Sequence, residues 1–251
     1  MMRKLSVTVW LLATGLISQQ GVAAEPDREA VNARYETTQC AHPCTANKHF
    51  QWWLMREPGQ VEIRHLYQRG EPAHHSGLWM QKPANQMAYA YLMHEDQRAI
   101  DYMDVDLKML GMKTDHSTWQ VKSQLVTDEE LVKLVKHPQS EVNRFGYRVE
   151  HYTGKQADGT QVDIMWMPAL KLPEAIHYGY PKHDVTIQLQ VLQFDGQASS
   201  VERAPKTGSN TLAYYQHVDF TDIGDMEHNA DDVKWLARAH GAPGIDQPHA
   251  H

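Results

Sequence analysis

The residues best placed to do chemistry are two cysteines, Cys40 and Cys44, which are separated by three residues. In an oxidising compartment, which the N-terminus described below indicates, two nearby cysteines usually form a disulfide. A bridge this short holds a local turn around His42 and Pro43. The spacing differs from the C-x-x-C-H of covalently attached haem and from the C-x-x-C of redox-active dithiols. We therefore predict a structural disulfide, with a redox or metal-binding role as the alternative.

Histidine is the second residue type of interest, because the chain has 16 of them and imidazole is a common ligand of Zn, Cu and Ni. The tightest groupings are His74 with His75, and His249 with His251 near the C-terminus. Neither an HExxH motif nor a finger-type Cys and His spacing accompanies them. Ordinary surface histidines account for most of this number, and the alternative is a transition-metal site at these four residues.

Motifs of covalent or nucleotide-dependent catalysis are absent from the sequence. It contains no G-x-S-x-G, no S-x-x-K, no P-loop and no glycine-rich dinucleotide-binding turn. We therefore nominate no catalytic residue.

Residues 1–24 have the organisation of a Sec-type signal peptide. A short basic stretch precedes an apolar run at residues 7–17, which is too short for a comfortable membrane span. Small residues then favour cleavage before Glu25. The first cysteine of the chain is Cys40, well past this point, so no lipid-acceptor cysteine follows the apolar run. We therefore predict a soluble protein of the bacterial periplasm that is not a lipoprotein.

The charge and hydropathy of the chain exclude two classes of partner. Its net charge of −7 argues against nucleic acid, which is bound by a basic surface, and against anionic lipid head groups. No second apolar run reaches the length of a membrane span, so we expect no transmembrane segment in the mature protein.

The elements that must position these side chains are mainly short strands. Residues 61–67 alternate apolar and charged side chains, as a half-buried strand requires. Asp158 and Gly159 indicate a tight hairpin between two further strands. Thr127 and Glu130 form a capping box at the start of a helix. These patterns predict one α+β domain at residues 49–241, in which a strongly curved antiparallel sheet packs on a few helices. Residues 25–48 show no periodicity and are expected to form a partly ordered N-terminal segment, and residues 242–251 a flexible tail.

Two of the expected strands, at residues 86–94 and 161–167, carry apolar side chains on both faces. Each face of such a strand needs cover, and an apolar ligand could supply it on one side. Methionine and aromatic side chains adapt well to lipid or acyl chains. The candidate ligand-binding residues are Trp79, Met87, Tyr89, Tyr91 and Trp166. The alternative is a core packed against the helices, which the same side chains would serve equally well.

The order of these elements resembles the LolA/LolB-type lipoprotein-carrier architecture. The resemblance rests on the stretches VEIRHLY, QMAYAYLMH, TDEELVKLV and GYRVEHYTGKQADGTQVDIMWM, which together lie within residues 48–221. It implies an incomplete barrel that is covered by helices and holds an apolar ligand, and it assigns no individual ligand-contacting residue. Together with the export signal, this favours a non-enzymatic periplasmic carrier of a lipid or acyl chain. The alternatives are a periplasmic Cu, Zn or Ni protein and a subunit of an envelope assembly with a protein partner.

Overall fold

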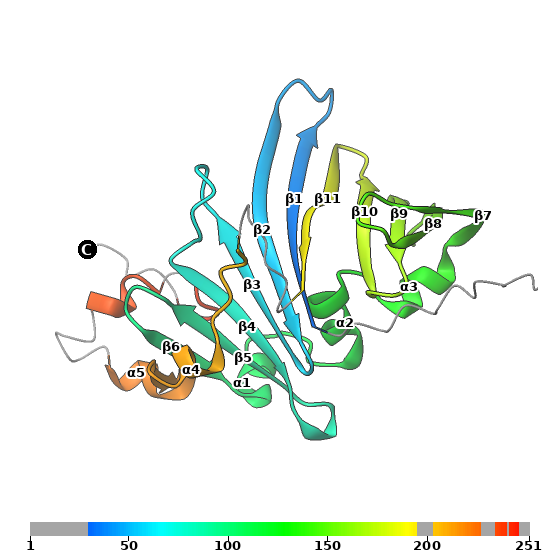
Figure 1. Cartoon of the computed structure of the whole chain (residues 1–251). Helices are drawn as coiled ribbons and strands as arrows, with labels where there is room; N and C mark the ends of the chain where they lie inside the picture. The colour runs from blue at the N-terminus through cyan, green and yellow to red at the C-terminus, as the bar shows by residue number, and fades with distance from the viewer. Residues whose placement is uncertain (1–29, 195–202, 227–233, 240, 246–251) are drawn as a thin grey trace, which may run out of the picture.

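The computed structural model of the chain describes residues 30–194, 203–226, 234–239 and 241–245 (Figure 1). The predicted signal peptide and the two histidines of the C-terminal tail lie outside these residues. Within the described ranges, no helix combines the length and apolar character needed to cross a membrane.

A single open sheet of twelve strands organises the described part of the chain. The strands are β1 Val31–Ala41, β2 Asn47–Glu57, β3 Gln60–Leu66, β4 His75–Gln81, β5 Met87–Met93, β6 Arg98–Tyr102, β7 Val135–Val142, β8 Arg148–Lys155, β9 Gln161–Met167, β10 Leu172–Gly179, β11 His183–Gln193 and β12 Gln216–Asp219. Their order in the sheet is β12-β6-β5-β4-β3-β2-β1-β11-β10-β9-β8-β7. The predicted α+β class with one curved sheet is confirmed. Strand β12 pairs with β6 in parallel, which corrects the expectation that the sheet is entirely antiparallel.

Five short α-helices and two 3-10 helices complete the described elements. They are α1 Asp104–Met109, α2 His116–Gln124, α3 Asp128–Lys133, α4 Ser209–Leu212, α5 Ile223–Met226, η1 Pro83–Asn85 and η2 Phe220–Asp222. The tall β1–β2 hairpin rises from the middle of the molecule, with α4, α5 and β6 at one end and α3 and β7–β10 at the other (Figure 1).

Strand β1 corrects the expectation of irregular structure in residues 25–48. It lies at the centre of the sheet and pairs with β2 on one side and β11 on the other. Its sequence lacks a clear alternation because Thr37, Thr38 and Gln39 follow the buried start of the strand. Backbone hydrogen bonds to two neighbouring strands stabilise this polar stretch. Strand β2 follows β1 in a hairpin, whereas β11 is distant in the sequence.

Register assigns the side chains to two faces, since directly opposed residues of neighbouring strands point to the same side. We name one the helix-covered face. It carries Tyr35, Trp52, Leu54, Val61, Trp79, Tyr89, Tyr91, Ile100, Tyr102, Leu189, Ile187, Ile176, Ile164, Val162 and Trp166. The opposite side is named the outer face.

Helices α1, α2 and α3 cover the helix-covered face. Leu107 of α1 is buried in the same cluster as Tyr89 and Tyr102. On α2, the Ser123 carbonyl accepts a hydrogen bond of 2.8 Å from buried Arg56. Leu131 of α3 packs into a second cluster with Ile164 and Trp166.

The outer face of β3–β6 is covered by residues 203–215, which run across these strands in Figure 1. Leu212 and Tyr215 of this segment pack on Ala90, Leu92 and Ala99. Strand β5 is therefore buried along its whole length, and both of its apolar faces are covered by this chain itself.

The predicted capping box at Thr127 is confirmed: its side chain accepts from the Glu130 amide, and the Glu130 carboxylate accepts from the Thr127 amide. The helix is short: it ends at Lys133, and the chain continues as strand β7, which contains Pro138. Proline is tolerated there because β7 is an edge strand with irregular pairing between Lys136 and Ser140.

Helix α2 was not expected from the sequence, although Asp115 supplies its N-cap by accepting from the Thr118 amide. The register of β11 against β1 shifts at Gln190, which has no partner on β1.

Candidate functional site

Four of the five expected ligand-contacting residues are buried together in one cluster. Trp79, Met87, Tyr89 and Tyr91 belong to one buried cluster on the helix-covered face. The Trp79 and Tyr89 rings lie 4.6 Å apart between centroids. The Lys122 ammonium group of α2 lies 4.6 Å above the Trp79 ring, and burial lowers the pKa of this amine. Helices and neighbouring side chains therefore surround these residues.

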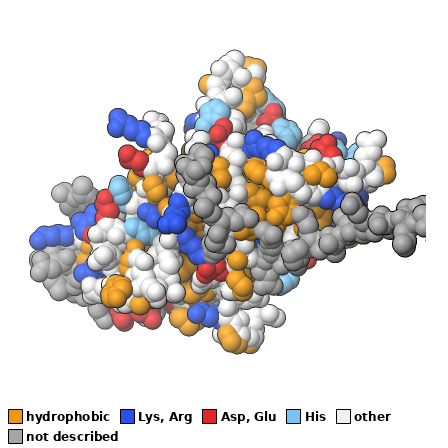
Figure 2. Space-filling model, in the orientation of Figure 1, with side chains coloured by type: hydrophobic (Ala, Val, Ile, Leu, Met, Phe, Trp, Pro, Cys, Tyr) orange, Lys and Arg blue, Asp and Glu red, His pale blue; other side chains and the backbone are white. Residues whose placement is uncertain are grey.

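Trp166, the fifth, is buried apart from them. It lies in the second cluster, formed by β8–β10 and α3, together with Val126, Leu131 and Ile164. Figure 2 shows hydrophobic side chains reaching the surface over the middle of the molecule, with charged side chains around them.

An open hollow of about 540 Å³ adjoins this second cluster, between α3 and the β8–β9 hairpin. We name it the α3 hollow. It is lined by Glu130, Lys133, Leu134, Lys155, Gln156, Ala157, Asp158, Val162 and Ile164. Val162 and Ile164 are almost fully buried and form an aliphatic floor, while the charged residues lie at its edge.

Local contacts set the shape of the α3 hollow. Gln156 of the β8–β9 turn donates to the Glu130 side chain at 3.2 Å, which ties the hairpin to α3. Gly154 of β8 allows Leu134 to approach closely, since a Cβ atom at this position would lie 2.6 Å from the Leu134 Cδ2. At the rim, Lys133 forms an ion pair of 2.7 Å with Glu129.

Two further hollows lie elsewhere on the sheet. One of about 760 Å³ is formed by residues 47–51 and 65–68, which include Lys48, His49 and two glutamines. Another of about 410 Å³ contains His137, His151 and Met165. The His137 and His151 rings stack at 4.4 Å between centroids. Neither histidine stands out in the sequence, because the two come together only through the pairing of β7 with β8.

The histidines that do stand out in the sequence have separate partners. His74 pairs with Glu95 at 2.8 Å, whereas the ring of His75 stacks on Tyr91 at 5.5 Å. His249 and His251 lie outside the described residues. A metal site at these four positions stays a prediction.

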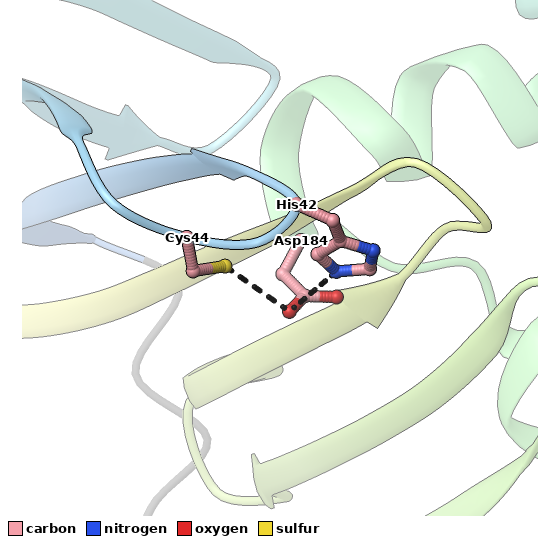
Figure 3. Close-up of side chains that lie close together, drawn as sticks. All are labelled: His42, Cys44 and Asp184. Carbon is pink, nitrogen blue, oxygen red and sulfur yellow. Dashed lines mark hydrogen bonds and ion pairs between the residues drawn. The ribbon is translucent and has the colours of Figure 1, made fainter.

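Cys40 and Cys44 form the predicted disulfide at the tip of the β1–β2 hairpin. The side chains of His42 and Cys44 lie beside Asp184, as Figure 3 shows. Asp184 is the cross-strand partner of Cys40, so a residue 140 positions after Cys44 completes this cluster. The sequence identified the cysteines and His42 but contained no signal for Asp184.

A buried polar network on the outer face was not predicted from the sequence. Glu62 accepts from the Ser76 hydroxyl at 2.6 Å and from the Thr207 hydroxyl at 2.9 Å. His94 lies between Ser76 and Tyr215, with both hydroxyl oxygens 2.9 Å from its ring nitrogens. Ser76 is buried and contacts both Glu62 and His94. Because Thr207 and Tyr215 bond to these two side chains, the network attaches residues 203–215 to the sheet.

No protein-family model and no curated protein matches the sequence. Among solved structures, the chain is similar to PNGF-II at 7% identity and a TM-score of 0.39, over 78% of this chain and 32% of that one. It is also similar to an uncharacterized conserved protein from Thermus thermophilus at 9% identity and a TM-score of 0.37, over 74% of this chain and 90% of that one. A LolA superfamily protein from Nitrosomonas europaea matches at 7% identity and a TM-score of 0.30, over 68% of this chain and 88% of that one.

The chain thus spans about a third of PNGF-II. Its own topology is one open, largely antiparallel sheet with helices packed across one face. This topology agrees with the incomplete barrel packed on helices that the order of elements in the sequence predicted.

Proposed function

We propose that this protein is a periplasmic carrier that binds the apolar chain of an amphipathic molecule in the α3 hollow. The observation that carries this proposal is the aliphatic floor of Val162 and Ile164, which borders the buried cluster of Trp166 and lies under a short helix. We therefore propose a ligand site near Trp166, rather than at the packed residues Trp79, Met87, Tyr89 and Tyr91.

The size and chemistry of the hollow suit a single acyl chain. Its volume of about 540 Å³ falls in the range of small-molecule sites, which are mainly apolar with a few polar groups. Burying about eight methylene groups contributes roughly 6 kcal/mol, which corresponds to a Kd of tens of micromolar. Lys155 at the rim is placed to contact an acidic head group, whereas Lys133 is already paired with Glu129.

The competing hollow at residues 47–51 and 65–68 supports this choice by contrast. It is larger and also has apolar side chains in its lining, those of Phe50, Leu66 and Tyr67. However, every residue that lines it is exposed or half-buried, so an acyl chain there would stay largely in contact with water. The α3 hollow presents buried aliphatic side chains instead.

Titration with a naturally fluorescent fatty acid, parinaric acid, tests the proposal. Leu134→Trp places a large ring at the rim of the hollow and is expected to weaken binding at least tenfold. Val132→Trp is the matched control, because Val132 lies two residues earlier, in the last turn of α3, and is 85% exposed. Its affinity is expected to stay within twofold of the parent protein.

Circular dichroism and thermal unfolding of both variants show whether each retains the fold. The proposal is wrong if the parent protein shows no saturable uptake, or if the two tryptophan variants bind equally well. Native mass spectrometry of protein purified from its own periplasm then identifies the molecule that is bound.

A further inference from the structure

The loop between β1 and β2 concentrates metal-binding side chains at one exposed tip. Cys40, His42 and Cys44 alternate along five residues, and Asp184 of β11 faces them across the strand pair. The His42 Nε2 lies 3.1 Å from the Asp184 Oδ2, and the Cys44 Sγ lies 4.0 Å from the same oxygen. These three ligand atoms all lie within 4.8 Å of one another (Figure 3).

In the oxidised protein this set is incomplete. The Cys44 sulfur is bonded to Cys40, and metals bind the thiolate form of cysteine. Only the imidazole of His42 and the carboxylate of Asp184 then remain as ligands, fewer than the three or four that protein zinc sites use. A disulfide at this position therefore keeps the site closed.

We propose that reduction of the Cys40–Cys44 disulfide opens a zinc site formed by Cys40, His42, Cys44 and Asp184. A dithiol reductant attacks one sulfur of the bridge, and a mixed disulfide forms and resolves. The reductant departs as its own disulfide. The two electrons and two protons that it gives up convert Cys40 and Cys44 to thiols. Zn²⁺ then displaces both thiol protons to the solvent and bonds to two thiolates, one imidazole nitrogen and one carboxylate oxygen.

The distances fit such an ion. Zinc bonds of about 2.0 to 2.3 Å in tetrahedral geometry separate neighbouring ligand atoms by roughly 3.3 to 3.8 Å. The Asp184 Oδ2 lies 3.1 Å from the His42 Nε2 and 4.0 Å from the Cys44 Sγ, and these two distances bracket this range. Two thiolates with one imidazole favour zinc over Ca²⁺ or Mg²⁺, which prefer oxygen ligands.

Backbone contacts hold the loop independently of the bridge. The His42 amide donates to the Lys182 carbonyl at 2.9 Å, and the Cys44 amide donates to the Ala41 carbonyl at 2.7 Å. Cys40 is also paired with Asp184 within the sheet. The ligand-bearing residues therefore stay near one another after reduction. His42 and Cys44 are exposed, so a reductant and an ion can both reach them.

Zinc titration of the full chain in competition with a colorimetric chelator tests this inference. After reduction by a phosphine we expect one equivalent to bind with a submicromolar Kd, and the oxidised protein to bind at least 100-fold more weakly. His42→Gln and Asp184→Asn, each in the reduced protein, are expected to weaken binding at least tenfold. His183→Gln is the matched control, because His183 is adjacent on β11, stacks on Tyr180 and points to the opposite face.

Cobalt substitution gives a second readout, since thiolate-to-cobalt charge-transfer absorption is expected only in the reduced protein. Tryptophan fluorescence of every variant confirms the fold. Equal zinc affinity of the reduced and oxidised protein, or equal effects of Asp184→Asn and His183→Gln, would overturn the inference. The site lies on a different part of the sheet from the α3 hollow, so this result is independent of fatty-acid binding.

Discussion

Acid is expected to destabilise this protein in part through one imidazole, that of His94. The His94 side chain is only 12% exposed and lies between Ser76 and Tyr215 on the outer face. Burial, followed by the positive charge of Arg64, lowers the pKa of His94 from 6.5 to about 3. Glu62 lies 3.9 Å away, but its carboxylate already accepts from Ser76 and Thr207.

The pKa difference sets the sign and the size of the effect. The unfolded chain binds a proton at this histidine below pH 6.5, whereas the folded protein does not do so until about pH 3. Stability therefore falls as the pH falls through this window, by at most about 1.4 kcal/mol per pH unit. Between pH 6.5 and 4.5 the loss attributable to His94 is about 2 kcal/mol.

Urea unfolding followed by tryptophan fluorescence, at half-unit steps from pH 7.5 to 4.5, measures this loss. His94→Gln retains a donor toward Ser76 but loses the acceptor for Tyr215, so we expect it to be about 1 kcal/mol less stable at pH 7.5. Because glutamine does not titrate, the variant should lose less stability on acidification. The two stability curves should then cross between about pH 5 and 6.

The control is His116→Gln, which replaces an exposed imidazole at the start of α2. Its curve is expected to run parallel to that of the parent protein. If His94→Gln also runs parallel to the parent down to pH 4.5, the imidazole does not resist protonation and the reasoning is refuted.

Three further changes have expected outcomes. Thr127→Ala removes the N-cap of α3 and should lower the free energy of unfolding by about 1 kcal/mol in urea titrations; an unchanged midpoint would show that α3 is held by its packing alone. Gly154→Ala should push the Leu134 side chain toward the α3 hollow and weaken parinaric acid binding severalfold. A fluorescence titration measures this affinity, and an unchanged value would contradict the prediction. Replacing both Cys40 and Cys44 by serine opens a loop of sequence separation 4 and should lower stability by about 2 kcal/mol on loop-closure entropy, a value to be checked in thermal scans of the oxidised protein.

Features with local causes could be predicted from the sequence. The capping box at Thr127 depends on atoms three residues apart, and the disulfide joins residues four apart. The burial of both faces of β5 follows from its unbroken apolar sequence. Alternation in residues 61–67 likewise identified β3, because successive side chains of a single strand point to opposite faces.

Contacts between distant parts of the chain were not predictable in this way. The place of β1 at the centre of the sheet depends on its pairing with β11, and no pattern inside β1 encodes that partner. The α3 hollow likewise exists because helix α3 ends early, at Lys133, and faces the β8–β9 hairpin.

The sequence by itself therefore determined the α+β class, the cysteine bridge and the cap of α3, because each is encoded within a few neighbouring residues. Only the tertiary structure placed Asp184 beside His42, closed the helix-covered face over Trp79 and Tyr89, and left Val162 and Ile164 bordering an open hollow. The physical reason is that strand register and the docking of helices bring together side chains separated by many residues, and local sequence patterns do not specify these long-range contacts.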